Sequence, residues 1–267
     1  MIVKLDFFSS SGKLNFITNP ACLILAILIF DVHFSLAQNE HGKSNDSSQD
    51  LEVPKKIYES ALGHGTHLFN GSQYVEPSRR ILGHQYYLND DWDLGQVVYE
   101  GNLYENVYLR LDCEKDELIA EVDDQYEYSI MIRLVKPKVN RFKLQNHWFI
   151  NLTSADNFEK FPGDGYFDVL HDGNIKVYAK RRKNFISYAT NDDILEEYRI
   201  VDKLYIVHNN IFYVVKGQKS VTALFEDRKK EIKTFIADQN LVFKNQKEEF
   251  TVAVISYYES LVNQQIQ

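Results

Sequence analysis

The sequence has little cysteine, proline or methionine, and its 38 acidic residues outnumber its 30 basic residues. Its 267 residues include two Cys, five Pro, two Met and 12 Gly. So few Pro and Gly residues exclude a collagen-like or proline-rich fibre. Apolar residues make up 44% and charged residues 25%, a composition that excludes bulk disorder. The formal net charge of −8 provides no basic surface for a nucleic-acid backbone, so we expect no nucleic-acid partner.

Long apolar runs are also scarce, and the longest lies near the N-terminus. Two lysines precede ten apolar residues, 21–30, and the small residues Ser35 and Ala37 follow them. This order is typical of a secretory signal peptide, whereas a membrane-spanning helix needs about 20 apolar residues. We therefore expect residues 1–37 to be a cleaved signal peptide, with an uncleaved N-terminal anchor as the alternative. The protein would then be exported, periplasmic or extracellular, with no membrane span in its mature chain.

Cleavage after Ala37 would remove Cys22 and leave Cys113 as the only thiol. An internal disulfide is then impossible, so the fold must be stabilised by burial of apolar side chains. Carboxylates flank Cys113 closely in the sequence, and such neighbours raise the pKa of a thiol. We do not expect Cys113 to act as a nucleophile.

The mature chain divides by composition. Residues 38–56 have almost no apolar content, which predicts a flexible leader. Residues 57–267 are expected to form a single domain, with a β-rich body at about 80–217 and a helical tail at about 219–263.

Short apolar segments separated by turn residues predict the body. About nine strands follow one another without a long helix between them, so we expect antiparallel pairing. The resulting sheet is compatible with a barrel, a half-barrel or an open form. We read residues 198–207 as one uninterrupted strand. The predicted turns lie at 100–102, 113–116, 171–174 and 208–210.

Apolar residues recur with helical spacing in the tail, within 226–240 and again after Asn245. The fold class predicted from both patterns is α+β, in which a C-terminal pair of amphipathic helices covers one face of a mainly antiparallel sheet. The residues on the apolar helix faces are Ile232, Phe235, Ile236, Phe250, Ala253, Val254, Tyr257 and Leu261.

One short stretch resembles a catalytic motif. Gly63-His64-Gly65-Thr66-His67 resembles the segment around the catalytic histidine of subtilisin-like proteases, but the sequence has neither the nucleophile segment nor the aspartate segment of that family. His64 and His67 share one side of a helical turn, yet a metal site needs three or four ligands. We assign no catalytic, cofactor-binding or metal-binding residue, and we expect no cofactor.

Two further stretches have alternative interpretations. Residues 89–95 place three carboxylates around Trp92, which suits a calcium loop, a sugar-binding platform, or a polar turn with Trp92 in the core. We favour the polar turn. The run Lys180-Arg181-Arg182-Lys183 is the densest basic segment, and in an acidic chain we interpret it as a solvated strand end rather than a nucleic-acid contact.

The function we expect is that of an exported, non-enzymatic protein that binds an unknown small molecule or an envelope protein partner. The 17 Tyr and 17 Phe residues are numerous enough to line a binding surface. One alternative is a hydrolase with dispersed catalytic residues, for which Asp91, Asp93 and His147 are the first suspects. The other is a scaffold or interaction subunit of an envelope complex.

We predict processing between Ala37 and Gln38 when the protein is expressed with its own N-terminus, because small residues occupy the −3 and −1 positions. Intact-mass analysis should then give a chain that begins at Gln38. Full-length protein in the membrane fraction would contradict cleavage.

Overall fold

The computed structural model describes residues 71–77, 81–123, 129–189 and 194–264. The predicted signal peptide, the predicted leader and the Gly63–His67 stretch lie outside these residues. Among the residues described, no helix combines the length and the apolar character that crossing a membrane requires.

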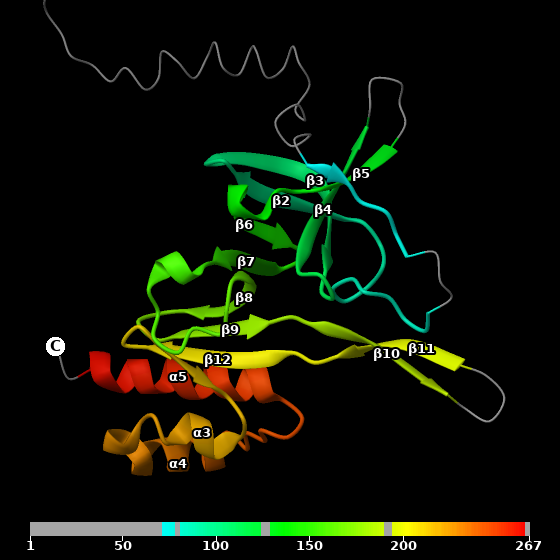
Figure 1. The fold of residues 1–267 in the computed structure, drawn as a ribbon. Coiled ribbons are helices and arrows are strands. Elements are labelled where there is room, and N and C mark those ends of the chain that lie inside the picture. The colour runs from blue at the N-terminus through cyan, green and yellow to red at the C-terminus, as the bar shows by residue number, and fades with distance from the viewer. Residues whose placement is uncertain (1–70, 78–80, 124–128, 190–193, 265–267) are drawn as a thin grey trace, which may run out of the picture. The chain divides into compact units, whose positions relative to one another are not determined.

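An antiparallel sheet of eleven strands forms the body (Figure 1). The strands of the structure are β1 (Ser72–Gln73), β2 (Asp93–Tyr99), β3 (Asn102–Asp112), β4 (Glu117–Asp123), β5 (Ser129–Arg133), β6 (Val139–Leu144), β7 (His147–Leu152), β8 (Gly165–Asp172), β9 (Lys176–Lys180), β10 (Lys183–Ala189), β11 (Ile194–Ile200), β12 (Lys203–His208) and β13 (Ile211–Val214). Their order in the sheet is β1-β5-β4-β3-β2-β6-β7-β8-β9-β12-β13. The described strands leave β1 and β13 as separate edges, so the sheet is open and the barrel option is excluded. The predicted α+β class is confirmed.

The tight turns follow from residues that tolerate positive φ. Glu100 and Gly101 connect β2 to β3 with φ of 50° and 80°, and Asn209 and Asn210 connect β12 to β13 with φ of 50° and 64°. Positive φ at both central residues is the geometry that matches the twist of hairpin strands. Both turns were predicted, as was the four-residue connection between β3 and β4.

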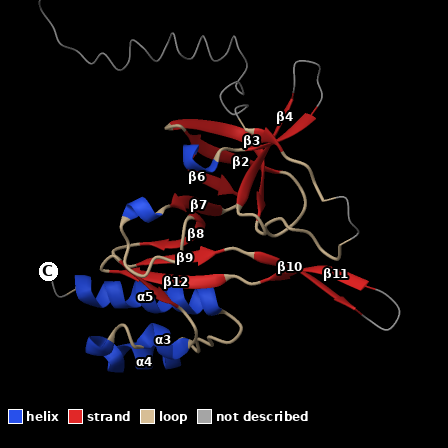
Figure 2. Ribbon diagram, in the orientation of Figure 1, coloured by secondary structure: helices blue, strands red, loops and turns tan. Residues whose placement is uncertain are grey.

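The prediction of one strand over 198–207 is wrong. β11 ends at Ile200 and β12 begins at Lys203, because Asp202 turns its carboxylate back to accept a hydrogen bond from the backbone N–H of Arg182 at 2.8 Å. β10 and β11 pair with each other as a separate two-stranded sheet, which we call the arm. Figure 2 shows the arm extending away from the body.

The tail contains α3 (Gln218–Thr222), α4 (Lys229–Asp238) and α5 (Lys247–Asn263). The predicted helix pair corresponds to α4 and α5, and α3 was not predicted. Their apolar faces bury Ile232, Phe250 and Val254 in one cluster with residues of β9 and β12. α5 therefore covers one face of the sheet (Figure 1).

α5 is attached to the sheet by polar contacts as well. Near its C-terminal end, the Glu259 carboxylate lies 2.7 Å from His171 Nε2 and accepts a hydrogen bond from the Ile175 N–H at 2.8 Å. Both contacts belong to the hairpin formed by β8 and β9.

Side chains on one side of β8 contribute to two apolar clusters. Tyr166 belongs to the cluster beneath β2–β7, and Leu170 packs against the cluster beneath the helices. Since side chains alternate along a strand, Asp168 projects on the same side, between the two clusters. A fully buried carboxylate at this position needs a partner, and the partner defines the candidate site.

Candidate functional site

The three suspects of the hydrolase alternative do not form one network. Asp91 is exposed before β2, and Asp93 accepts a hydrogen bond from Gln145 Nε2 at 3.0 Å. His147, the first residue of β7, lies instead with its Nδ1 3.0 Å from an Asp168 oxygen. Of the three, only His147 joins a buried polar cluster.

Trp92 lies in a polar turn, and its ring packs against the Arg110 guanidinium and the core. Its ring is 4.2 Å from the Arg110 guanidinium carbon and packs beside Tyr74 and Tyr86. Asp90 lines a small polar hollow of about 240 Å³ together with Tyr86 and Arg110. Within the described ranges, no cluster of three or more His, Cys, Asp or Glu could hold a metal ion. This geometry supports the polar-turn interpretation.

The basic run is not a solvated strand end, and that prediction is wrong for its first two residues. Lys180 and Arg181 are only 6% and 8% exposed. Neighbours in a strand point to opposite faces of the sheet, so the two cations are buried separately. Each must therefore meet its own carboxylate.

Lys180 is neutralised from the β3–β4 turn. Its ammonium lies 2.8 Å from Asp116 Oδ2 and donates to the Tyr166 carbonyl at 3.0 Å. Burial lowers the pKa of Lys180, and the charge of Asp116 opposes this shift. Gly165 leaves the necessary space, because a Cβ there would lie 1.9 Å from Asp116 Oδ2.

Arg181 is neutralised on the other face. Its Nε and Nη2 donate to Asp168 Oδ2 at 2.9 and 2.6 Å. Nη1 and Nη2 donate to the two Glu248 oxygens at 2.5 and 3.0 Å, and Nη1 also reaches Asp202 at 3.1 Å. The guanidinium thus connects β8, the link between β11 and β12, and the first turn of α5. We call Arg181, Asp168, Glu248, Asp202 and His147 the arginine network.

His147 completes the arginine network at its solvent side, where its side chain is 34% exposed. The hydrogen bond with Asp168 raises the pKa of the imidazole, and burial opposes this. An imidazole oriented by a buried carboxylate is the base-and-orienter part of an acid–base site. Here, however, Arg181 already compensates the Asp168 charge, which makes the pair more suited to a structural role.

The pKa of the Cys113 thiol is raised, as expected, but the main cause is burial rather than the neighbouring carboxylates. Cys113 is 2% exposed, and burial raises the pKa of its thiol to about 12. The charges of Asp202 and Asp112 contribute in the same direction.

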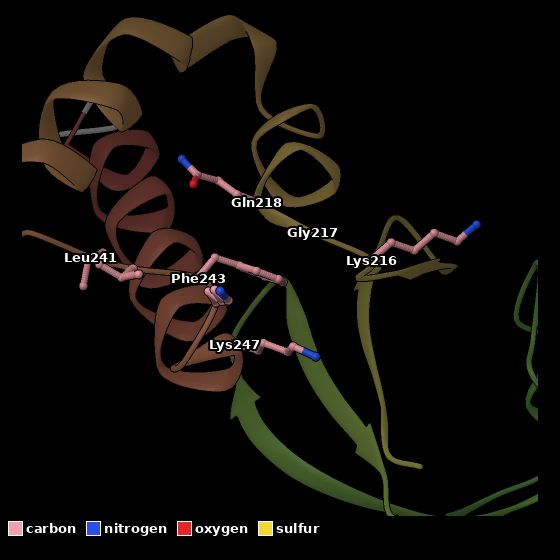
Figure 3. Close-up of a pocket in the computed structure, with 8 residues that line it drawn as sticks. Lys216, Gly217, Gln218, Leu241, Phe243 and Lys247 are labelled. Carbon is pink, nitrogen blue, oxygen red and sulfur yellow. The ribbon is translucent and has the colours of Figure 1, made fainter.

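A hollow also lies in the tail. About 700 Å³ of space opens between the start of α3 and the segment that connects α4 to α5. Figure 3 shows Lys216 beside Gly217 and Lys247 at the start of α5, with both ammonium groups extending away from the ribbon. No motif in the sequence marked the hollow, because its residues come from two separate parts of the chain. We call it the lysine hollow; its lining residues are Lys216, Gly217, Gln218, Leu241, Val242, Phe243, Lys244 and Lys247.

Two adjacent arginines test the arginine network. We expect Arg181→Met to lower the free energy of unfolding by about 3–5 kcal/mol, because it leaves the buried Asp168 carboxylate without its cation. Arg182→Met should change it by no more than about 0.5 kcal/mol, because that side chain is exposed. Urea denaturation of both variants measures the difference, and equal losses would show that the network is not stabilising.

Two histidines should respond to pH with opposite signs. The pKa of His147 is raised on folding, so its contribution to stability is present below pH ~6.5 and is lost as pH rises through the folded pKa. Burial lowers the pKa of His84, so its contribution is present above pH ~6.5 and is lost as pH falls through the folded pKa.

We therefore predict that the stability advantage of the wild type over His147→Gln shrinks between about pH 5.5 and 8.5. Its advantage over His84→Gln should grow across the same range. Unfolding free energies measured at several pH values give both slopes, and slopes of the same sign would contradict the assignment.

The known proteins offer no guide to this site. No protein-family model, no curated protein and no solved structure matches the chain. The function must be inferred from the geometry of the chain itself.

Proposed function

We propose that this is an exported, non-enzymatic protein that binds an acidic segment of a partner protein in the lysine hollow. The observation that carries the proposal is the charge of the hollow. Its eight described lining residues include three lysines and no carboxylate, in a chain whose net charge is −8. A local excess of cations on an acidic protein favours an anionic ligand.

The ammonium groups of the three lining lysines are accessible to a ligand. Lys216, Lys244 and Lys247 are all exposed, and no described ion pair occupies them. Lys247 opens α5, whose first turn is attached to the sheet through Glu248 and Arg181. The arginine network therefore supports the position of one wall of the hollow.

The floor of the hollow is apolar. Leu241 and Phe243 are half-buried, and Val242 is 54% exposed. An exposed apolar side chain beside cations suits a ligand that presents an apolar residue between carboxylates. Burial of that residue would add to an attraction that salt otherwise screens.

The openness of the hollow favours a protein over a small molecule. Sites for small molecules typically bury 70–90% of the ligand surface. This hollow is largely open to solvent, so it would leave a small ligand exposed. A side chain held by a partner protein does not need such enclosure, because the rest of the interface anchors it.

Export is inferred from the sequence alone, through the apolar run and the small residues before Gln38. The partner would accordingly be another periplasmic or extracellular protein.

Hydrolysis is the second candidate function, and the His147–Asp168 pair is the observation that favours it. A base of this kind must contact a nucleophile or a water in a substrate complex. Compensation of Asp168 by Arg181 makes this candidate the weaker one.

A defined peptide tests the proposal. We expect the fluorescein-labelled peptide Asp-Asp-Leu-Asp-Phe-Asp-Asp to bind the wild type, and binding to weaken in 1 M salt, where the screening length is about 3 Å. Lys216→Glu, Lys244→Glu and Lys247→Glu together should weaken binding by roughly tenfold or more, because each exposed ion pair is worth about 0.2–1 kcal/mol and reversal adds repulsion.

The matched control reverses three exposed lysines of α4 outside the hollow, Lys229→Glu, Lys230→Glu and Lys233→Glu. Fluorescence anisotropy should detect less than about a twofold effect in this control. Equal losses in both triple variants would show nonspecific attraction, and no binding by the wild type would reject the hollow as the site.

A further inference from the structure

The arm, together with Leu82 and Val201 next to it, exposes many large apolar side chains. Of the twelve large apolar side chains exposed among the described residues, five lie here, which makes the arm the main concentration of such groups. Monomeric proteins rarely expose large apolar patches, and an isolated two-stranded ribbon is only marginally stable in water. The five are Leu82, Tyr188, Ile194, Ile200 and Val201.

One edge of the arm is already covered. The Leu82 N–H donates to the Glu196 carbonyl at 2.8 Å, and the Tyr198 N–H donates to the Leu82 carbonyl at 3.1 Å. The backbone groups of Glu196 and Tyr198 therefore point away from β10. In an antiparallel pair, the residues opposite them must also point their backbone groups outward.

The register identifies those residues on β10. Phe185 lies opposite Tyr198, and Ser187 lies opposite Glu196. The contact of the Lys183 N–H with the Cys113 carbonyl at 3.2 Å confirms the same parity. Beyond Lys183, no described strand pairs with this edge, so β10 presents the N–H and C=O groups of Phe185 and Ser187 for a further strand.

After Lys183, the exposed edge of β10 lacks the residues that usually prevent a strand edge from pairing with another chain. Natural edges are usually protected by charged residues, especially lysine, or by proline. Residues 184–189 contain neither a charge nor a proline. In a chain with 25% charged residues and a net charge of −8, this uncharged segment of β10 is a surface on which two copies can approach without repulsion.

We propose that two copies of this protein pair their β10 strands antiparallel, so that their arms form one four-stranded sheet. With Ser187 opposite its own counterpart, Phe185 faces Ala189 and Ile186 faces Tyr188 across the two-fold axis. Each copy then covers the open edge of the other, and the assembly closes at two. Because the two β10 strands run in opposite directions, their Lys183 residues lie at opposite ends of the pair, and the two charges are kept apart. This inference does not rest on the lysine hollow.

Sedimentation analysis of the protein produced from the full-length sequence tests the pairing. We expect a concentration-dependent equilibrium between monomer and dimer. Ser187→Pro should raise the dissociation constant by roughly tenfold or more, because proline removes an outward N–H that the arm itself does not use. Ser187→Lys should do the same, because it places two like charges opposite each other.

Ser260→Lys is the matched control, since it adds the same charge at an exposed residue of α5. It should leave the dissociation constant unchanged, and thermal unfolding of all three variants checks that they fold. If Ser187→Pro fails to fold, Ser187→Lys decides the outcome. A wild type that stays monomeric at every concentration, or a dimer that persists in the folded Ser187 variants, overturns the proposal.

Discussion

Two neighbouring cations buried on opposite faces of one sheet constrain the rest of this structure. Lys180 meets Asp116 on one side, and Arg181 meets Asp168 and Glu248 on the other. Removing an ion from water costs several kcal/mol, so neither side chain is tolerated without its partner. The partners come from the β3–β4 turn, from β8 and from α5. Body and tail are therefore connected at the point where the chain leaves the sheet to form the arm.

The local parts of the fold were predictable from the sequence. The turns at Gly101 and Asn210 depend on residues that tolerate positive φ, and the helices depend on a short periodicity. In both cases the deciding residues are near neighbours in the chain. The same holds for the assignment of Trp92 to a polar turn, since its surroundings in the sequence were already rich in turn residues.

The candidate sites were not predictable, because their partners are distant in sequence. Arg181 lies 67 positions from Glu248, and Lys180 lies 64 positions from Asp116. Seen alone, four consecutive cations resemble a solvated segment. The break after Ile200 was missed for a related reason: Asp202 is one polar residue among β-forming neighbours, and only its contacts with Arg181 and Arg182 show that the strand ends there.

The position of Glu248 near the C-terminus has a consequence for biosynthesis. A chain is made from its N-terminus, so β8 and Arg181 leave the ribosome well before the helix that supplies this carboxylate. Until α5 has emerged, the guanidinium lacks one of its charge partners and the sheet face beneath α5 is uncovered. The residues of the body are therefore synthesised before the helix that covers one of its faces. The charge balance of the arginine network is complete only once α5 is available.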